Sequence, residues 1–445
     1  MLKYYPSSVR VKNKFKDICS QHYGIMESQI LTSAKGRYTP NISVCTANMP
    51  NYHKIIVHEK AEMNHHLSGY GIYFEESMIR LLGEGIERYA LLLASEVYKN
   101  KEVKASYNVV RKMGEVMPWE YINMYSKEDY DRLGSFTNMR SIDKDTKLSW
   151  IKCPSIFDKN REIYIPAQLL FIGFRNEKEN EALFAPGFSK GAAAHVTLEN
   201  ALEAAVMEAV EADAFTINWY TSRKTRSIII DDENLIEIIE EAVKDIDCEV
   251  LPLEFSLEGA PGHTIGVALI NKKDNRPTVV LGCQSSLDAK KAIYKALLEA
   301  LAIYYLAVNG PLLLPEQYLL SVKDNNYNNL DSNVAYWASE VDGEKKKAYF
   351  YNLCREEVLL SSLENFEKED KKKEIGDILG KLNKISNYGV FLDITPPEVM
   401  NKGWKVVRTF FPELVQMSLP SFPYSNHPRL KKYGGVLNEL PHPVP

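Results

Sequence analysis

Two segments of this 445-residue chain repeat one another at an offset of 124 positions, and that repeat restricts the possible folds more than any other feature. In each segment a glycine-containing stretch precedes a run of apolar residues at helical spacing. Glu84 and Glu87 in the first run correspond to Glu208 and Glu211 in the second. Because residues three apart share one face of a helix, each run carries a pair of neighbouring carboxylates. The sequence therefore predicts two related loop-helix units.

The same pattern recurs a third time in weaker form. The three predicted loops, each with the helix after it, are 68–71 with 74–94, 187–191 with 197–219, and 282–288 with 292–306. In the third unit Glu299 takes the place of Glu84, while Ala302 stands where a second glutamate would be. Runs that predict strands are 162–165, 264–270 and 278–281. The expected fold is α/β, one catalytic domain over residues 1–445 built of internally repeated loop-helix and β-strand units.

Charge and composition exclude several classes of protein. With 45% hydrophobic and 25% charged residues the chain has globular composition, and a formal charge of -5 gives no reason to expect nucleic acid. The six cysteines lie far apart without zinc-ligand spacing, which favours reduced thiols. No run approaches the ~18 apolar residues that span a bilayer, so we expect no membrane partner and a cytoplasmic location. The charged stretch 361–375 is typical of a solvated helix face.

The surroundings of the second glutamate pair point to a bound metal. Between Gly191 and Ser222 the sequence has no Lys or Arg, and Glu208 and Glu211 are flanked by apolar side chains. Two bare carboxylates there would be costly, so an outside cation is the natural remedy. Mg²⁺, which is held by one or two carboxylates together with phosphates, suits such a pair. The alternative is an exposed acidic face that pairs with a distant basic element.

The first glutamate pair is ambiguous when it is taken alone. Arg80 and Arg88 lie four residues before and after Glu84, so ordinary surface ion pairs are the simpler explanation of Glu84 and Glu87. The repeat is what extends the metal-site hypothesis to this helix.

A nucleotide's phosphates need hydrogen-bond donors, which glycine loops and nearby bases supply. The chain has no G-x-x-x-x-G-K-[ST] motif, and 68–71 is too short for a dinucleotide fingerprint, so the hypothesis is a nonstandard nucleotide site. The candidate nucleotide-binding residues are Ser68, Gly69, Arg88, Ser189, Lys190, Gly191 and Lys295.

Proline occupies every second position at the end of the chain, at Pro441, Pro443 and Pro445. This spacing restricts φ and favours an extended arm over residues 438–445. A frayed tail is the common alternative. A rigid arm could enter an active site and present its terminal carboxylate or carbonyl groups, which makes the three prolines candidate catalytic residues.

Taken together, these segments resemble the YcaO family, and within it the azoline-forming cyclodehydratases. The likeness covers most of the chain and rests on 68–71, 83–89, 142–146, Trp150, 165–167, 189–213, Trp219, 282–299, 393–395 and the terminal P-x-P-x-P. The chain departs from the family's usual pattern at Ala212 and Lys295, where arginine is common, and at Ala302, where glutamine is common.

The resemblance implies a YcaO-type three-layered α/β fold that binds ATP and Mg²⁺, with the proline-rich end in the active site. Carried over by position, Arg88 is a phosphate contact, and the metal-bridging ligands are Glu84, Glu87, Glu208 and Glu211. The implied reaction is heterocyclisation of a ribosomally made precursor peptide. A Cys, Ser or Thr side chain adds to the preceding amide carbonyl, the amide oxygen is phosphorylated, and phosphate leaves to give a thiazoline or oxazoline.

The family also implies partners, which the sequence itself does not reveal. They are the precursor peptide, a separate subunit that recognises its leader, a flavin dehydrogenase that oxidises azolines, and a second copy of the chain in a homodimer. Two alternatives stay open. Another YcaO reaction, such as thioamide or amidine formation, shares the ATP site, although the terminal prolines favour cyclodehydration. A non-catalytic scaffold that binds peptide or nucleotide is supported by the absence of arginine at Ala212.

Overall fold

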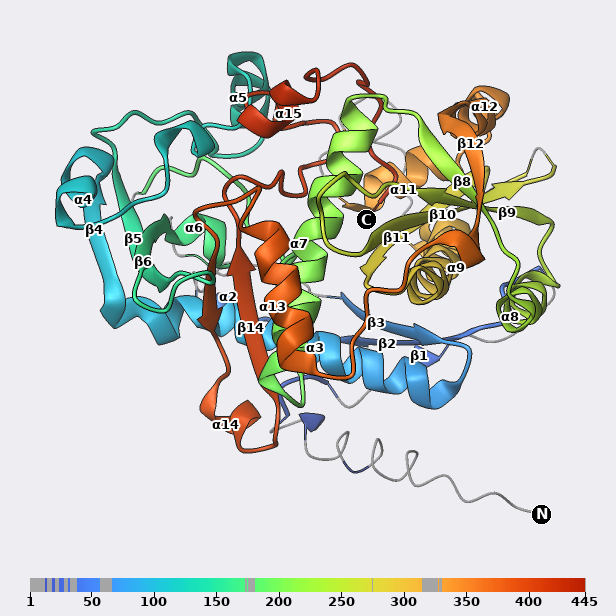
Figure 1. Ribbon diagram of the computed structural model, residues 1–445, viewed down its shortest axis with the longest axis horizontal. Coiled ribbons are helices and arrows are strands. Elements are labelled where there is room, and N and C mark those ends of the chain that lie inside the picture. The colour runs from blue at the N-terminus through green and yellow to red at the C-terminus, as the bar shows by residue number, and fades with distance from the viewer. Residues whose placement is uncertain are drawn as a thin grey trace.

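The centre of the fold consists of three sheets, each followed by a helix that packs against it (Figure 1). The computed structural model describes residues 13, 18–20, 24–27, 31–32, 38–56, 66–172, 174, 181–273, 275–313, 327 and 330–444. The first unit is the sheet β1 (Leu31–Thr32), β2 (Ser43–Asn48), β3 (His66–Gly71) with helix α3 (Phe74–Tyr98). The second is the sheet β13 (Val390–Asp393), β14 (Lys405–Phe410), β7 (Ala192–His195) with α7 (Leu198–Tyr220). The third is the sheet β11 (Val279–Ser286), β10 (His263–Asn271), β9 (Cys248–Glu254), β8 (Thr225–Ile229), β12 (Cys354–Leu359) with α9 (Ala289–Leu313).

The strand that leads into each central helix lies at the edge of its sheet. In the described part of the chain, β3, β7 and β11 each pair with a strand on one side, which leaves the backbone groups of the other side for different partners. In addition, α3 contacts β7, α7 contacts β11, and α9 contacts β3. These cyclic contacts close the three units into a ring, so that edge strands and helices meet around one centre.

Most of the elements predicted from the sequence are confirmed. The helices expected at 74–94, 197–219 and 292–306 are α3, α7 and the middle of α9, and Thr197 caps α7 by accepting the Asn200 N–H at 3.3 Å. The strands expected at 162–165 and 264–270 are β6 (Glu162–Pro166) and β10. All six cysteines are free thiols, as expected.

Two of the predicted loops are strands instead. Residues 68–71 belong to β3 and 282–286 to β11, because a glycine in each lets the strand lie directly against its helix. A Cβ on Gly69 would lie 2.0 Å from the carbonyl oxygen of Ser77, and a Cβ on Gly282 would lie 2.2 Å from that of Ala296. At these two positions glycine therefore signals close helix–strand packing, not a turn.

The other elements surround this core. A fourth sheet has the order β4 (Glu102–Ser106), β5 (Lys147–Pro154), β6. Further helices of the described chain are α2 (His53–Ile56), α4 (Tyr107–Met113), α5 (Lys127–Gly134), α6 (Ala167–Leu170), α8 (Glu233–Val243), α11 (Leu330–Ala338), α12 (Gly343–Leu353), α13 (Lys371–Leu382), α14 (Pro397–Met400) and α15 (Pro428–Lys432). The stretch 361–375 is not one helix face as expected: α13 starts at Lys371, after the cap residue Asp370, and an irregular segment precedes it.

Helix α9 corrects the expectation that no run is long and apolar enough to cross a membrane. By length and composition its residues Ala289–Leu312 pass that test, but 61% of the apolar window is buried inside the fold. The helix packs against β10 and β11 and also touches β3. We therefore interpret α9 as a core helix, whose apolar character serves packing between sheets.

Candidate active site

One glutamate from each central helix accepts a backbone hydrogen bond from the strand region that precedes that helix. The donor N–H and acceptor carboxylate pairs, with N–O distances, are Ser68 to Glu84 (2.9 Å), Gly191 to Glu208 (3.2 Å) and Cys283 to Glu299 (2.8 Å). The carboxylates thus satisfy N–H groups that edge strands leave unpaired. The internal repeat brings these three glutamates to a common centre, which we call the acidic centre.

Glu211 and Lys190 form an ion pair inside the acidic centre. Lys190 Nζ lies 2.6 Å from Glu211 Oε1, and Glu211 Oε2 accepts the Ser285 N–H of β11 at 3.1 Å. The side chain of Glu211 is 2% exposed and that of Lys190 is 20% exposed. A carboxylate so far from water needs partners of this kind, because a buried charge without them is strongly disfavoured.

Burial, and after it the charge of neighbouring glutamates, disfavours the charged forms of the acids in the centre. Burial raises the pKa of Glu208 to about 7, with Lys190 opposing the rise and Glu211 adding to it. Burial likewise raises the pKa of Glu299 to about 7. Burial, followed by the charge of Glu208, raises the pKa of Glu87 well above its usual range. Burial lowers the pKa of Lys190, but the surrounding carboxylates, Glu211 first, more than offset this and hold it well above its usual value. The centre therefore favours protonation of these acids unless a cation joins them.

The first glutamate pair belongs to this centre and not to an ordinary surface. Glu84 lies 3.7 Å from Arg88, so one of the expected i,i+4 pairs exists, whereas Arg80 pairs with Glu76 instead at 2.9 Å. Burial raises the pKa of Glu84, which is not the behaviour of a solvated surface carboxylate. Glu87 is influenced by the charge of a glutamate on another helix.

The carboxylates suit Mg²⁺ held together with phosphate groups. In the described residues, no three His, Cys, Asp or Glu side chains converge closely enough to hold an ion by themselves. Mg²⁺ does not need such a cage, since it is commonly held by one or two carboxylates plus phosphate oxygens and water. The carboxyl groups with a raised pKa around the centre are Glu84, Glu87, Glu208 and Glu299. A divalent cation would stabilise their charged forms, which burial disfavours.

A buried arginine holds the loop that carries Lys190. Arg408 on β14 donates through Nη1 to the carbonyls of Ser189 at 3.1 Å and Lys190 at 2.6 Å, and through Nη2 to the Leu169 carbonyl at 3.1 Å. Its side chain lies in the core, where burial lowers its pKa to about 10. Gly191 follows with a φ of 91°, a left-handed conformation that suits glycine. The loop is thus fixed in shape before any ligand arrives.

The predicted nucleotide-binding residues lie on all three units. Ser68 and Gly191 offer their N–H groups to glutamates, and Arg88 lies beside Glu84. Lys295 on α9 is partly buried, and burial lowers its pKa. Gly69 faces α3, where it allows close packing.

Contrary to the expectation of an unneutralised helix, α7 receives bases from distant parts of the chain. Lys371 of α13 pairs with Glu203, and Arg429 of α15 pairs with Asp213 at 2.8 Å. Distant bases therefore do pair with these two acids, but Asp213 is buried and does not belong to an exposed acidic face. Glu208, by contrast, accepts its hydrogen bond from the Gly191 N–H within the acidic centre.

The proline-rich arm is packed into the core and is not frayed. Side-chain N–H groups hold four of its carbonyl oxygens. The pairs, with N–O distances, are Trp219 with Leu440 (3.1 Å), Trp337 with Pro441 (2.8 Å), and Asn333 with both His442 (2.7 Å) and Val444 (2.8 Å). Pro441 and Pro443 are buried, and Pro445 lies outside the described residues.

The arm runs along α7 in the direction of the glutamates. Leu440 is held by Trp219, whereas His442 packs edge-on against Phe215, with ring centroids 5.9 Å apart. Phe215 follows Glu211 by one helical turn. These two contacts place the arm beside the part of α7 that follows Glu211.

Two residues of the centre lie outside the predicted site. The repeat pairs Glu299 with Glu84, but the missing second glutamate at Ala302 kept Glu299 out of the predicted metal ligands. No local motif signals Arg408, whose place follows from the pairing of β14 with β7. Ala212, where the family commonly has arginine, is fully buried in the aromatic cluster around the arm.

The fold and the site together define a class: an α/β protein whose repeated helices collect glutamates around a place for a metal and phosphates. A profile of the YcaO cyclodehydratase family, described as ATP- and Mg²⁺-binding, matches residues 68–415. The chain belongs to this family, and its cofactors are ATP and Mg²⁺.

Solved structures share the fold at low sequence identity. A heterocyclase in complex with substrate and cofactor has a TM-score of 0.72 at 16% identity, over 98% of this chain and 57% of that one. YcaO from Methanopyrus kandleri, bound with AMPPCP and Mg²⁺, has a TM-score of 0.65 at 13% identity, over 98% and 96% of the two chains. The E. coli microcin synthetase McbBCD complex with pro-MccB17 bound has a TM-score of 0.56 at 17% identity, over 86% and 87%.

This chain therefore spans 57% of the length of the heterocyclase that it matches. At such identities the likeness establishes the fold. Among curated proteins, none matches the sequence.

Proposed function

We propose that this chain is an ATP-dependent cyclodehydratase that converts Cys, Ser or Thr residues of a ribosomally made precursor peptide into thiazolines or oxazolines. The observation that carries the proposal is that the acidic centre and the anchored proline arm both use side chains of α7. An amide oxygen is a poor leaving group until it is phosphorylated. The reaction therefore needs bound phosphates and a proton acceptor in the same place.

The residues around the centre divide into two roles. Those that would hold Mg²⁺ with the nucleotide are Glu84, Glu87, Glu208, Glu211 and, from the third unit, Glu299. When bound, Mg²⁺ would neutralise negative charge on the phosphates. Those that would contact phosphate are Ser68, Gly69, Arg88, Ser189, Lys190, Gly191 and Lys295. Lys190 is the base nearest to the carboxylates, 2.6 Å from Glu211.

In the proposed reaction the side chain of the substrate residue adds to the preceding amide carbon and gives up its proton. The amide oxygen accepts the γ-phosphoryl group of ATP. The carbon–oxygen bond then breaks, inorganic phosphate leaves, and the amide nitrogen loses its proton as the carbon–nitrogen double bond forms. The arm would supply the proton acceptor at its end. Because Leu440, Pro441, His442 and Val444 use their carbonyl oxygens for anchoring, the oxygens of Pro443 and Pro445 are the candidates, with Pro441 in the rigid spacer.

The substrate and partners follow by analogy. The matched heterocyclase is described with substrate, and the E. coli synthetase as a McbBCD complex with pro-MccB17. We infer that the substrate is a precursor peptide, that a separate subunit recognises its leader, and that a flavin dehydrogenase acts afterwards. We also infer that the chain is a single catalytic domain, forms a homodimer and is located in the cytoplasm. A cavity of about 460 Å³ beside the arm, lined in part by Asp129, Arg132, Tyr336 and Pro441, offers room for part of a peptide.

The proposal is tested by incubating the protein with Mg-ATP, a leader-binding partner and a Cys-rich precursor, and then weighing the peptide. Loss of one water for each modified residue, with release of phosphate, is the expected result. Exchange of oxygen for sulfur would indicate thioamide formation instead. No mass change and no phosphate release would indicate a binding scaffold, and would overturn the proposed activity.

A further inference from the structure

On two of the three central helices, a base lies one turn before the first glutamate. Arg80 precedes Glu84 on α3, and Lys295 precedes Glu299 on α9. The corresponding residue on α7 is Ala204, which is exposed. The repeat thus leaves α7 without its own base at the position where the other two helices each carry one.

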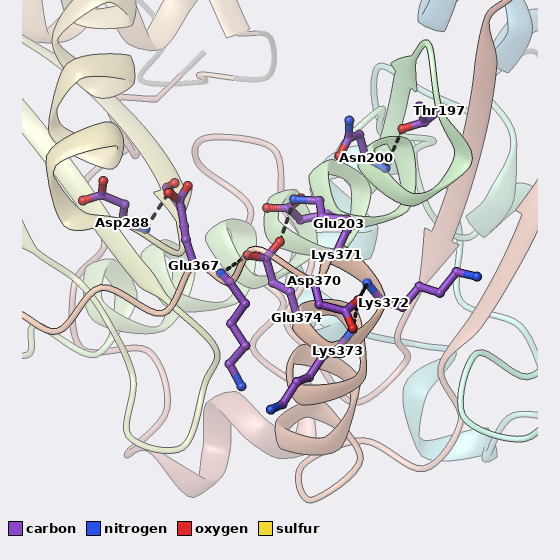
Figure 2. Close-up of polar contacts among 12 residues, drawn as sticks. Thr197, Asn200, Glu203, Asp288, Glu367, Asp370, Lys371, Lys372, Lys373 and Glu374 are labelled. Carbon is purple, nitrogen blue, oxygen red and sulfur yellow. Dashed lines mark hydrogen bonds and ion pairs between the residues drawn. The ribbon is translucent and has the colours of Figure 1, made fainter.

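Lys371 of α13 brings a base to the adjoining residue of α7. Its ammonium pairs with Glu203, the neighbour of Ala204, and lies 2.6 Å from Glu374 Oε1 (Figure 2). The Glu374 side chain is 3% exposed, whereas that of Lys371 is 36% exposed. Glu374 therefore fixes the ammonium from the protein side, and the ammonium stays accessible to a ligand.

Glu203 links Lys371 to the acidic centre. The charges that act on Lys295 come from Arg80 first and then from Glu203, Glu211 and Glu208. Glu203 is thus part of the same electrostatic surroundings as two of the central glutamates. The Glu203–Lys371 pair thus lies on the helix that carries Glu208 and Glu211, and Glu203 acts together with them on Lys295.

The backbone on either side of Lys371 is held in place. Glu367, in the segment before α13, pairs with Lys291 of α9 at 2.6 Å. Asp370 caps the first turn of α13, and apolar residues later in α13 pack in one cluster with α7. Lys371 therefore starts from a fixed backbone position between α7 and α9, and its long side chain is the part that can move.

We propose that Lys371 is a further phosphate-binding residue of the nucleotide site, which leaves Glu203 for a phosphate oxygen when Mg-ATP binds. This inference rests on the proposed function. A lysine can make the exchange because its ammonium is a point charge on a flexible stem, with no fixed fork geometry to satisfy. Glu203 then competes with the nucleotide. Removal of the lysine and removal of the glutamate charge should therefore have opposite effects on affinity.

The test measures the Kd of the full chain for Mg²⁺-AMPPCP by calorimetry. We expect Lys371→Ala to weaken binding about tenfold, the loss of one charge-assisted hydrogen bond, and Lys371→Arg to restore most of it. Glu203→Gln should leave the affinity unchanged or increase it. Lys372→Ala is the matched control, because Lys372 lies on the same turn but points away from Glu203 (Figure 2). Thermal denaturation of each variant checks that it is folded.

The outcomes separate the explanations. If Lys371 and Glu203 were a structural clamp, Lys371→Ala and Glu203→Gln would weaken binding and lower the Tm in parallel, and this result would overturn the inference. Equal affinities of Lys371→Ala and Lys372→Ala would overturn it too, while leaving the proposed function intact. Failure of the unmodified chain to bind Mg²⁺-AMPPCP would overturn both, since no phosphate would then be present for Lys371 to contact.

Discussion

The ammonium of Lys190 lies 2.6 Å from a carboxylate oxygen of Glu211, whose side chain is 2% exposed. The same ammonium is acted on by the charges of Glu299 and Glu208. A single lysine thus supplies positive charge to glutamates from two helices of the ring. It performs, within the fold itself, part of the neutralisation that a bound divalent cation would complete.

We expect Lys190→Met to destabilise the Mg²⁺-free chain by about 3–5 kcal/mol, because it leaves a buried carboxylate without its partner. Added Mg²⁺ should recover part of this loss. Urea denaturation with and without Mg²⁺ measures both effects. Lys152→Met is the matched control: Lys152 pairs with Glu162 on the surface, with side chains 45% and 50% exposed, so its loss should have little effect on stability. Equal costs for the two variants would contradict the role of Lys190.

We expect Glu208→Gln to abolish ATP turnover while the protein stays folded. The substitution keeps the side-chain shape and the acceptor oxygen for the Gly191 N–H, but removes the charge that a metal requires. Phosphate release assays and thermal denaturation measure the two properties. Glu199→Gln, in the first turn of the same helix, is the control and should retain turnover. Full turnover in Glu208→Gln would show that Glu208 is not a metal ligand.

Much of this site could be predicted from the sequence because the repeat is local. The spacing of Glu208 and Glu211 on a helix is visible in the chain itself. What could not be predicted is how the units close into a ring, because that depends on cyclic contacts between helices and the edge strands of other units. Arg408 and Lys371 lie on elements that are far in sequence from the predicted site, and no short motif predicts either of them. The strand at 68–71 is not predicted for a related reason. Gly69 is required there because β3 packs closely against α3, and this tertiary contact is not visible in the local sequence.

The stability of the Mg²⁺-free chain should fall as the pH rises towards neutrality. Burial raises the pKa of Glu208 and of Glu299 to about 7, so each holds a proton more tightly in the folded than in the unfolded state. Such groups favour the folded state at low pH, and the advantage is lost between the unfolded pKa of about 4.3 and the folded pKa. Urea denaturation from about pH 4 to about pH 8, a range that spans this window, measures the slope.

The control for this pH dependence is Glu299→Gln, which removes one of the two titrating groups but keeps a side chain of the same shape. Its stability should decline less steeply over the same range. Saturating Mg²⁺ should also flatten the profile of the unmodified chain, because the ion favours the charged carboxylates. Identical slopes for the variant and the unmodified chain would show that Glu299 does not titrate in this window.

Loss of the proline arm should slow cyclisation more than it weakens nucleotide binding. Deletion of 441–445 removes the three alternating prolines and leaves the glutamates in place. Asn333→Ala is the milder variant: it keeps every proline but removes the donor to the carbonyls of His442 and Val444. We expect a large loss of peptide cyclisation in the deletion, an intermediate loss in Asn333→Ala, and little change in the Kd for Mg²⁺-AMPPCP in either. Normal cyclisation in both variants would reduce the arm to a structural element.

Two glycines of the first unit should change the stability of the protein in opposite directions when each is replaced by alanine. Gly83 lies within α3 and a Cβ there would meet nothing within 4 Å, so Gly83→Ala should stabilise the protein by up to about 1 kcal/mol through better helix propensity. A Cβ on Gly69 would lie 2.0 Å from the Ser77 carbonyl oxygen, so Gly69→Ala must push β3 from α3 and should cost about 1–3 kcal/mol.

The displacement of β3 should also disturb the acidic centre, because the N–H of the neighbouring Ser68 donates to Glu84 across the β3–α3 contact at 2.9 Å. Gly69→Ala is therefore expected to weaken Mg²⁺-AMPPCP binding as well as stability, whereas Gly83→Ala leaves binding unchanged. Urea denaturation and calorimetry on both variants measure the two effects. If Gly69→Ala lost stability but bound the nucleotide as tightly as Gly83→Ala, the spacing between β3 and α3 would not matter for the acidic centre.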